Sequence, residues 1–316
     1  MAGVEEFPHT LLDLERRFPD ERSCEEYLAS LRWAAGFVCP GCGAGKVWRS
    51  SRGLRECAGC GRQTSVRAGT IFQDSRLPLL LWFRAIWWVT SQKTGASALG
   101  LQKVLGLGSY RTAWACLHKL RRAMVRPGRE PLAGPVEVDE TFVGGHEVGG
   151  GRRHIGKKAL VAVAAEVRGK GVGRIRLRRV QDSSADSLLA FIRGAVVPGA
   201  LVITDGLPSY GRLPELGYRH EVRPIRGRKE LVPTLLPAVH RVASLLKRWL
   251  LGTHQGSVSR EHLDEYLEEF TFRFNRRASR HRGLLSHRLL EQAVAARPAP
   301  YASLIKRVRS ARRHNA

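Results

Sequence analysis

Residues 136–143 read VEVDETFV, and this stretch and the two runs that follow it decide the fold class. Its β-branched and aromatic side chains, like the apolar residues of 159–167 (ALVAVAAEV) and 173–180 (GRIRLRRV), are typical of β-strands. Asp139 lies inside the first run, where a carboxylate is costly unless it is paired or binds a metal ion. The sequence therefore predicts three strands, the first of which carries an unusually placed acid.

Helical and strand patterns alternate in the part of the chain that follows. The expected elements are a helix at 183–196, strands at 200–206 (ALVITDG) and 218–224, and helices at 236–252 and 259–277. Ser183 or Ser184 is expected to cap the first of these helices. Strands first, then strands alternating with helices, predict a mixed α/β sheet.

Two aspartates stand at strand positions where chemistry is expected. Asp139 lies in the first strand, and Asp205 follows the buried strand ALVIT. Open α/β sheets place their sites at the carboxyl edge, where these acids could meet and a divalent cation would relieve their repulsion. Two metal ions about 4 Å apart are the known arrangement for in-line attack on a phosphodiester. For either aspartate alone, a turn or capping role is an equal alternative.

The helix expected after these strands reads LPAVHRVASLLKRWLLGTHQG at 236–256. Pro237 suits its first turn, and Gly252 is expected to end it. His240 and Lys247 are seven residues apart, so two turns bring them to nearly the same face. They line either a half-exposed face or a site.

Four of the six cysteines form two matched pairs, CPGCG at 39–43 and CAGCG at 57–61, with fourteen residues between the pairs. Thiolates at this spacing suit the tetrahedral ligand set of zinc, and the glycine after each pair permits the turn. A disulfide or a redox C-x-x-C motif is the alternative. We predict a structural zinc ribbon held by Cys39, Cys42, Cys57 and Cys60, and Cys24 and Cys116 as core thiols.

A basic helix pair precedes the strands. Residues 95–126 contain two helical patterns separated at Gly106 and Gly108, with Ser109 as the cap of the second. This arrangement predicts a helix-turn-helix, and an ordinary helical hairpin with a solvated face is the alternative. The candidate DNA-contacting residues are Arg111, His118, Lys119, Arg122 and Arg126.

Composition supports a polyanionic partner. The chain of 316 residues has 53 Lys+Arg against 28 Asp+Glu, a formal charge of +25, which favours nucleic acid. The longest apolar run, 77–89, is interrupted by Arg84, and the N-terminus does not resemble a signal peptide. We therefore expect a cytoplasmic, nucleoid-associated protein with reduced cysteines and no membrane contact.

The chain divides into several expected regions, with the Pro/Gly-rich PLAGPVE at 131–137 as the main boundary. These are a helical segment at 1–37, a zinc ribbon at 38–68, a helix-turn-helix-like region at 76–128, a mixed-sheet domain at 136–298 and a basic tail at 299–316.

These motifs together resemble a known family. The chain is similar to the bacterial insertion-sequence transposases that join an N-terminal zinc ribbon and helix-turn-helix to an RNase H-like DDE domain. The resembling segments are CPGCG and CAGCG, SVRAGTIFQDSRLPLLLWFRAIW (65–87), VEVDETFVGG (136–145), ITDGLPSY (203–210), LLKRWLLGTHQG and EYLEEFTFRFNRR. The resemblance extends from about residue 20 to 290.

The resemblance implies a catalytic set. The family pattern has two aspartates, a third metal-facing residue and a lysine seven positions later, which fall here on Asp139, Asp205, His240 and Lys247. His240 stands where much of the superfamily has glutamate, so the chain resembles the His variant. Magnesium prefers oxygen ligands. His240 is therefore expected to bind magnesium or manganese or to orient water or phosphate, unless Glu230, Glu265 or Glu268 replaces it.

The resemblance also implies an activity. The family cleaves double-stranded DNA at terminal inverted repeats and joins the 3′-hydroxyl ends to target DNA by two-metal chemistry, and a homodimer or higher oligomer on DNA is expected. Lys247 would hold a phosphate beside the scissile bond. The rival interpretations are a non-catalytic zinc-ribbon DNA-binding regulator and an RNase H-like nuclease that cuts without joining.

Overall fold

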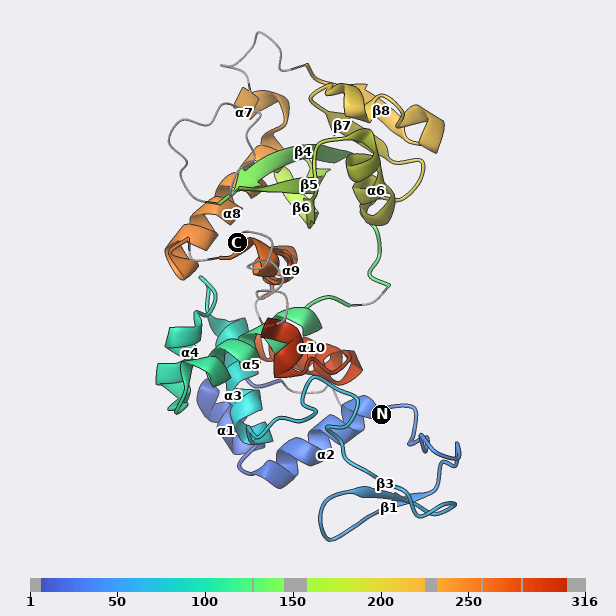
Figure 1. The fold of residues 1–316 in the computed structure, drawn as a ribbon, viewed down its shortest axis with the longest axis vertical. Coiled ribbons are helices and arrows are strands. Elements are labelled where there is room, and N and C mark those ends of the chain that lie inside the picture. Colours follow the sequence, from blue (N-terminus) through green and yellow to red (C-terminus); the bar gives the residue numbers. More distant parts are fainter. Residues whose placement is uncertain are drawn as a thin grey trace, which may run out of the picture. The chain divides into compact units, whose positions relative to one another are not determined.

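The computed structural model describes residues 7–126, 128–144, 158–224, 232–256, 258–279 and 281–305. The chain forms two compact units (Figure 1). The first comprises Met1–Arg126 and Ala278–Ala316, and the second comprises Pro127–Arg277. Because the second unit ends at Arg277, it is shorter than the mixed-sheet domain that the sequence predicted to reach residue 298.

The first unit combines helices with a small ribbon. Its helices are α1 (Leu11–Arg17), α2 (Glu21–Arg32), α3 (Leu79–Ser91), α4 (Ala98–Leu105), α5 (Tyr110–Ala123) and α10 (Arg282–Ala295). Its ribbon is the antiparallel sheet of β1 (Val47–Arg49), β2 (Arg55–Cys57) and β3 (Gln63–Thr64). Thr10 and Asp20 begin α1 and α2 with reciprocal capping boxes, which divide the helical segment expected at 1–37.

Helix α10 belongs to this unit because its apolar face packs against α2, α3 and α5. The hydroxyls of Thr90 and Ser286 lie 2.7 Å apart in this contact, which joins α3 to α10. Of the basic tail expected at 299–316, residues 306–316 lie outside the described residues, and the described part includes the buried Leu304.

The expected break between α4 and α5 is confirmed. Gly106 ends α4 in the left-handed conformation, with φ 61°, and Ser109 caps α5 by accepting a hydrogen bond from the Arg111 amide at 3.2 Å. The local sequence thus forms the short helix, glycine turn and second helix that a helix-turn-helix requires.

The second unit is built on a five-stranded sheet of order β6-β5-β4-β7-β8 (Figure 1). The strands are β4 (Val136–Val143), β5 (Ala159–Arg168), β6 (Gly171–Val180), β7 (Leu201–Thr204) and β8 (Arg219–Val222). β5 runs antiparallel to β4 and β6, whereas β7 is parallel to both β4 and β8. The mixed sheet and its helices form the RNase H-like α/β architecture that was expected.

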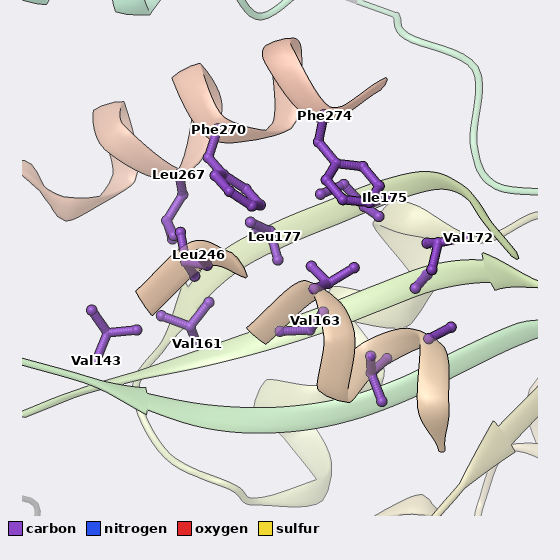
Figure 2. Close-up of a cluster of buried hydrophobic side chains, with 14 of the residues drawn as sticks. Val143, Val161, Val163, Val172, Ile175, Leu177, Leu246, Leu267, Phe270 and Phe274 are labelled. Atoms are coloured by element: carbon purple, nitrogen blue, oxygen red, sulfur yellow. The ribbon is translucent and has the colours of Figure 1, made fainter. Parts of the chain in front are cut away.

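Helices cover both faces of this sheet. On one face, α8 (Pro237–His254) and α9 (Leu263–Asn275) bury a core in which Leu246, Leu267 and Phe270 lie over Val161 and Leu177 (Figure 2). On the other face, α6 (Ala185–Ala195) packs with the 3₁₀ turns η1 (Pro208–Tyr210) and η2 (Pro214–Leu216). The short α7 (Val232–Leu235) and η4 (Arg260–His262) precede α8 and α9.

Two expected helices begin at or beside the predicted residues, and one of them ends later than predicted. Ser184 caps α6, as one of the two serines was expected to do. Pro237 occupies the first turn of α8, but that helix continues past Gly252 to His254. It ends because Gln255 adopts the left-handed conformation, with φ 50°, whereas Gly252 remains helical.

Candidate active site and metal centre

The sheet topology brings the two aspartates to the same edge. β4 and β7 are adjacent parallel strands, paired through Val136 with Val202 and Glu137 with Ile203. Asp139 lies on β4, and Asp205 directly follows the last residue of β7. Parallel strands end at the same edge of a sheet, so both acids lie where open α/β sheets place their sites.

Asp139 is held in an environment that opposes its ionisation. Its Oδ1 accepts a hydrogen bond from the Glu140 amide at 2.8 Å. Burial raises the pKa of Asp139, and the negative charge of Asp205 raises it further. Asp205 accepts a hydrogen bond from the Leu207 amide at 3.0 Å, which orients its carboxylate in the turn after β7. A cation between these acids would relieve their repulsion.

His240 and Lys247 reach the acids from α8. The His240 Nε2 atom lies 4.0 Å from Asp139 Oδ2. This Nε2 atom is buried and has no hydrogen-bond partner among the described residues, which leaves a nitrogen ligand facing a carboxylate. Burial lowers the pKa of Lys247, while the charge of Asp139 opposes that shift. His240 thus lies beside Asp139, and Lys247 is near enough for the charge of Asp139 to act on its pKa.

Sequence analysis missed a third acid at this edge. Burial raises the pKa of Glu140 to about 8, and the charges of Asp139 and Asp205 contribute. Glu140 Oε1 and the Tyr210 hydroxyl are buried atoms without a hydrogen-bond partner among the described residues. Tyr210 is 0% exposed, so its hydroxyl lies in a closed polar site beside the acids. The sequence VDET already indicated Glu140 as a candidate, because it places Asp139 and Glu140 in succession inside a strand.

Lys158 is a second residue that sequence analysis missed. It precedes β5, whose first residue pairs with Val143 at the carboxyl end of β4. Its positive charge acts on Lys247 strongly enough to help lower the pKa of that lysine, although burial is the larger cause. The carboxyl edge of the sheet therefore combines acids with two lysines.

Glu137 is the third missed residue, and its contacts are the best defined. Its Oε2 atom accepts hydrogen bonds from the amides of Ala238 at 2.7 Å and Val239 at 3.1 Å. Burial raises the pKa of Glu137, although these two amides oppose the shift. The side chain joins β4 to the start of α8. Glu137 stands two residues before Asp139 on β4, and its partner Val239 stands directly before His240 on α8.

The acids considered as replacements for His240 lie elsewhere or outside the described residues. Glu230 is among the residues that the structure does not describe. Glu268 accepts a hydrogen bond from Arg129 at 2.9 Å, and Glu265 lies 3.9 Å from His262 Nδ1. Both are on α9, and of the candidates that the structure describes, His240 is the one that lies beside Asp139.

The four ribbon cysteines form a second cluster, in the first unit. Their sulfur atoms all lie within 4.8 Å of one another. Gly41 and Gly59 donate amide hydrogen bonds to Cys39 and Cys57, each at 3.4 Å. The amides of Gly41 and Cys42 lower the pKa of Cys39 to about 6, which favours the thiolate that zinc binds. The residues present therefore fit a closed, structural zinc site.

The backbone and the remaining cysteines agree with this assignment. Gly43 and Gly61 have φ values of 75° and 71°, as the turns after the two pairs require. Cys24 and Cys116 are buried away from this cluster, and burial raises the pKa of the Cys24 thiol to about 12. Both are core thiols, as the sequence predicted.

The structure corrects part of the DNA-contact set expected on α5. Lys119 is buried and donates a hydrogen bond from Nζ to the Gln73 carbonyl at 3.2 Å, so its ammonium is engaged within the unit. The His118 ring packs on Trp114, with the ring centroids 4.1 Å apart. The helical period alone did not distinguish these engaged side chains from solvated ones.

The start of α5 is the exposed part of that helix. Arg111 and Arg126 are exposed, Arg122 is half-buried, and Tyr110, which sequence analysis missed, is 51% exposed. In helix-turn-helix proteins the N-terminal residues of the second helix contact base edges. Tyr110 therefore joins Arg111 as a candidate at the start of the helix.

Comparison with known proteins finds a match in each of the two regions. Residues 131–275 match the ISXO2-like transposase domain, and residues 19–63 match the transposase zinc-ribbon domain. The chain thus carries both a transposase domain and a transposase zinc ribbon. An uncharacterized protein in transposable element ISH50 of Halobacterium salinarum is 29% identical over 279 residues, which cover 82% of this chain and 92% of that protein. Both Asp139 and Asp205 lie within residues 131–275, the segment that matches the transposase domain.

The matches confirm the predicted zinc ribbon and DDE-type domain. In the described part of the transposase, none of the helices has the length and apolar character needed to cross a bilayer.

Proposed function

We propose that the transposase cleaves DNA at the terminal inverted repeats of its element and joins the resulting 3′-hydroxyl ends to target DNA. The observation that carries this proposal is that Asp139 and Asp205 lie on, or directly after, adjacent parallel strands at one sheet edge, with His240 Nε2 4.0 Å from Asp139 Oδ2. The charge of Asp205 helps to raise the pKa of Asp139, and His240 Nε2 has no hydrogen-bond partner among the described residues; carboxylates and an imidazole are donors that a divalent cation can bind.

Each residue has a separate role in the proposed reaction. Asp139 and Asp205 would hold magnesium or manganese, and His240 would complete the ligand set from α8. The bound ions would activate water and stabilise the leaving oxygen. Lys247 and the neighbouring Lys158 would bind phosphates on either side of the scissile bond, because both carry positive charge at this edge.

Recognition of the element ends is assigned to the first unit. We propose that the zinc ribbon and the α4–α5 pair bind the terminal repeats, with Arg111, Arg122 and Arg126 as basic contacts and Tyr110 beside Arg111. The formal charge of +25 supports binding to the DNA backbone. Synapsis of two ends requires at least two catalytic domains, so we propose a homodimer or higher oligomer on DNA.

A strand-transfer assay separates this proposal from its rivals. The full chain is incubated with labelled end-containing duplex, a target plasmid and magnesium or manganese. We expect nicking at the element end followed by joined products. Nicking without joining would indicate a nuclease, and DNA binding without nicking would indicate a regulator.

Metal analysis tests the ribbon independently. We expect about one zinc ion per chain, and its loss in a Cys39→Ser variant, because a structural site needs all four thiolates. A Cys24→Ser variant is the matched control, since Cys24 is a buried thiol outside the cluster. Zinc absent from gently purified wild-type protein would refute the ribbon assignment.

A further inference from the structure

The helix that carries His240 begins without a cap of its own. The residue before α8, Leu236, offers no side-chain hydrogen bond, and Pro237 has no amide hydrogen to donate. The next two amides, those of Ala238 and Val239, are the first that need an acceptor. Helix termini buried without such acceptors are strongly disfavoured, so the acceptor must come from elsewhere in the fold.

Glu137 supplies this acceptor from 101 residues away in the sequence. Its Oε2 atom accepts both amide hydrogens, at 2.7 Å from Ala238 and 3.1 Å from Val239. The side chain is 1% exposed, so water does not compete for these bonds. A carboxylate at a helix N-terminus also interacts favourably with the helix dipole, and burial strengthens that interaction.

On both β4 and α8, the capping contact lies next to a residue of the proposed site. Glu137 and Asp139 are two residues apart on β4, so they lie on the same face of the sheet. Val239 and His240 are consecutive on α8. The cap therefore fixes the helix at the turn where His240 approaches Asp139 to 4.0 Å.

A second tether lies just before this turn. Arg223, which follows β8, donates from Nη1 to the Leu235 carbonyl at 3.1 Å and from Nε to Glu221 at 2.7 Å. The Glu137 carboxylate on β4 thus holds the first turn of α8, and the guanidinium of Arg223, directly after β8, holds the end of α7 just before it. Two tethers from different strands restrict both the translation and the tilt of the helix.

We propose that Glu137 is a positioning residue of the transposase active site, which sets the distance between His240 and Asp139 by capping α8. This inference rests on the proposed metal-dependent function. Glu137 does not itself face the cations, because its accepting oxygen is engaged by two helix amides. Its effect on metal binding is transmitted through α8.

Manganese binding to the full-length protein, followed by electron paramagnetic resonance, tests the inference without relying on activity. The test variant is Glu137→Gln, which keeps the shape and one acceptor oxygen but removes the charge. We expect a roughly 10-fold weaker manganese affinity, the size typical for residues that orient metal ligands. Hydrogen exchange at Ala238 and Val239 should accelerate in the same variant.

Glu166→Gln is the matched control. Glu166 is another buried glutamate of the same sheet, 3% exposed, but its partner in register is Val136, at the opposite end of β4 from the site. Its substitution also removes a buried charge, so it measures the general effect of destabilising the sheet. We expect manganese affinity to remain within about twofold of wild type.

A double variant separates positioning from a purely structural cap. If Glu137 acts through His240, Glu137→Gln should weaken manganese binding little further in a His240→Ala background. Equal weakening in both backgrounds, or wild-type affinity in Glu137→Gln despite faster exchange at Ala238 and Val239, would overturn the inference. Should Glu137→Gln fail to fold, Glu137→Asp provides the same comparison, because it keeps the charge and shortens the tether by one methylene.

The proposed function fails in a different way. Wild-type manganese binding that Asp139→Asn does not weaken would refute the metal site itself. Binding that depends on Asp139 but not on Glu137 would refute only the positioning role.

Discussion

Buried carboxylates at the two ends of the central sheet differ in whether a positively charged side chain pairs with them. At one end Glu166 receives hydrogen bonds from the Arg174 guanidinium at 2.9 and 3.1 Å and from the amides of Arg174 and Ala133. At the other end Asp139, Glu140 and Asp205 form no ion pair with arginine or lysine among the described residues. The same sheet thus contains one fully compensated acid and a group of uncompensated ones.

This difference indicates which end of the sheet requires a bound cation. Burial opposes ionisation at both ends, but the hydrogen bonds from Arg174 keep the pKa of Glu166 below its ordinary value. At the carboxyl edge no arginine of the described residues pairs with the acids in this way, and burial raises the pKa values of Asp139 and Glu140. Buried acids with raised pKa values are typical of functional sites, where a bound cation can supply the missing positive charge.

The largest effect is expected from removing an uncompensated acid. Asp139→Asn or Asp205→Asn should lower strand cleavage more than about 100-fold, because even the outer partners of metal ligands contribute 10- to 100-fold. The metal-free Asp139→Asn protein should melt at the same temperature as wild type or higher, since the substitution removes a charge that burial disfavours. Cleavage assays and thermal melts in a chelator measure the two effects.

The control for this prediction is Glu166→Gln, which should lower the melting temperature and leave cleavage intact. Full strand cleavage by Asp139→Asn would contradict the two-metal assignment, and a lower melting temperature of its metal-free form would contradict the contrast between the two ends.

The sequence predicted features whose causes are local. VEVDETFV was expected to form a strand at 136–143, and the structure has β4 at those residues. The cysteine pairs were equally predictable, because the spacing of each pair is sufficient to build half of a zinc site. Asp205 could be placed at a strand tip because an apolar run precedes it directly.

Features that depend on distant partners were not predictable. Glu137 could be recognised as a polar residue in a strand, but the amides that it accepts from belong to a helix 101 and 102 residues further along the chain. Lys119 looked solvated because nothing in its helix reveals the Gln73 carbonyl. The apolar face of α10 likewise does not indicate which unit it covers.

The second largest effect is expected from adding a divalent cation, which supplies the positive charge that the acids at the carboxyl edge lack. Manganese or magnesium should raise the melting temperature of the catalytic unit, because a ligand at 100 times its dissociation constant stabilises a protein by about 2.7 kcal/mol. Asp139→Asn should lose most of this shift, and Glu166→Gln should keep it. An equal shift in wild type and Asp139→Asn would place the binding elsewhere on the chain.

A smaller effect is expected from the identity of the third residue. The His240 imidazole supplies a nitrogen, which suits manganese better than magnesium, whereas a carboxylate suits both. His240→Glu should therefore shift the ratio of magnesium-supported to manganese-supported cleavage by about 10-fold toward magnesium, roughly 1.4 kcal/mol. A wild-type protein indifferent to the metal, together with an active His240→Ala variant, would contradict direct ligation.

The smallest effect is expected from Glu166, the buried acid that pairs with Arg174. Because its pKa is lowered in the folded protein, its contribution to stability should be lost at low pH. Burial alone would raise the pKa of Glu166, but Arg174 and the amides of Arg174 and Ala133 outweigh it and lower the pKa from 4.5. Its contribution is therefore complete above pH 4.5 and is lost as the pH falls through the lower folded-state value. Glu166→Gln should cost about 1 kcal/mol at neutral pH, a loss of about 2–4 °C in melting temperature.

As the pH falls through the lowered folded-state pKa of Glu166, the melting curves of wild type and Glu166→Gln should converge, because protonation removes the same charge that the substitution removes. A difference that instead grows as the pH falls would mean that Glu166 is neutral in the folded protein at neutral pH. Both ends of the sheet would then hold uncompensated acids, and the contrast that assigns a cation to only one of them would be lost.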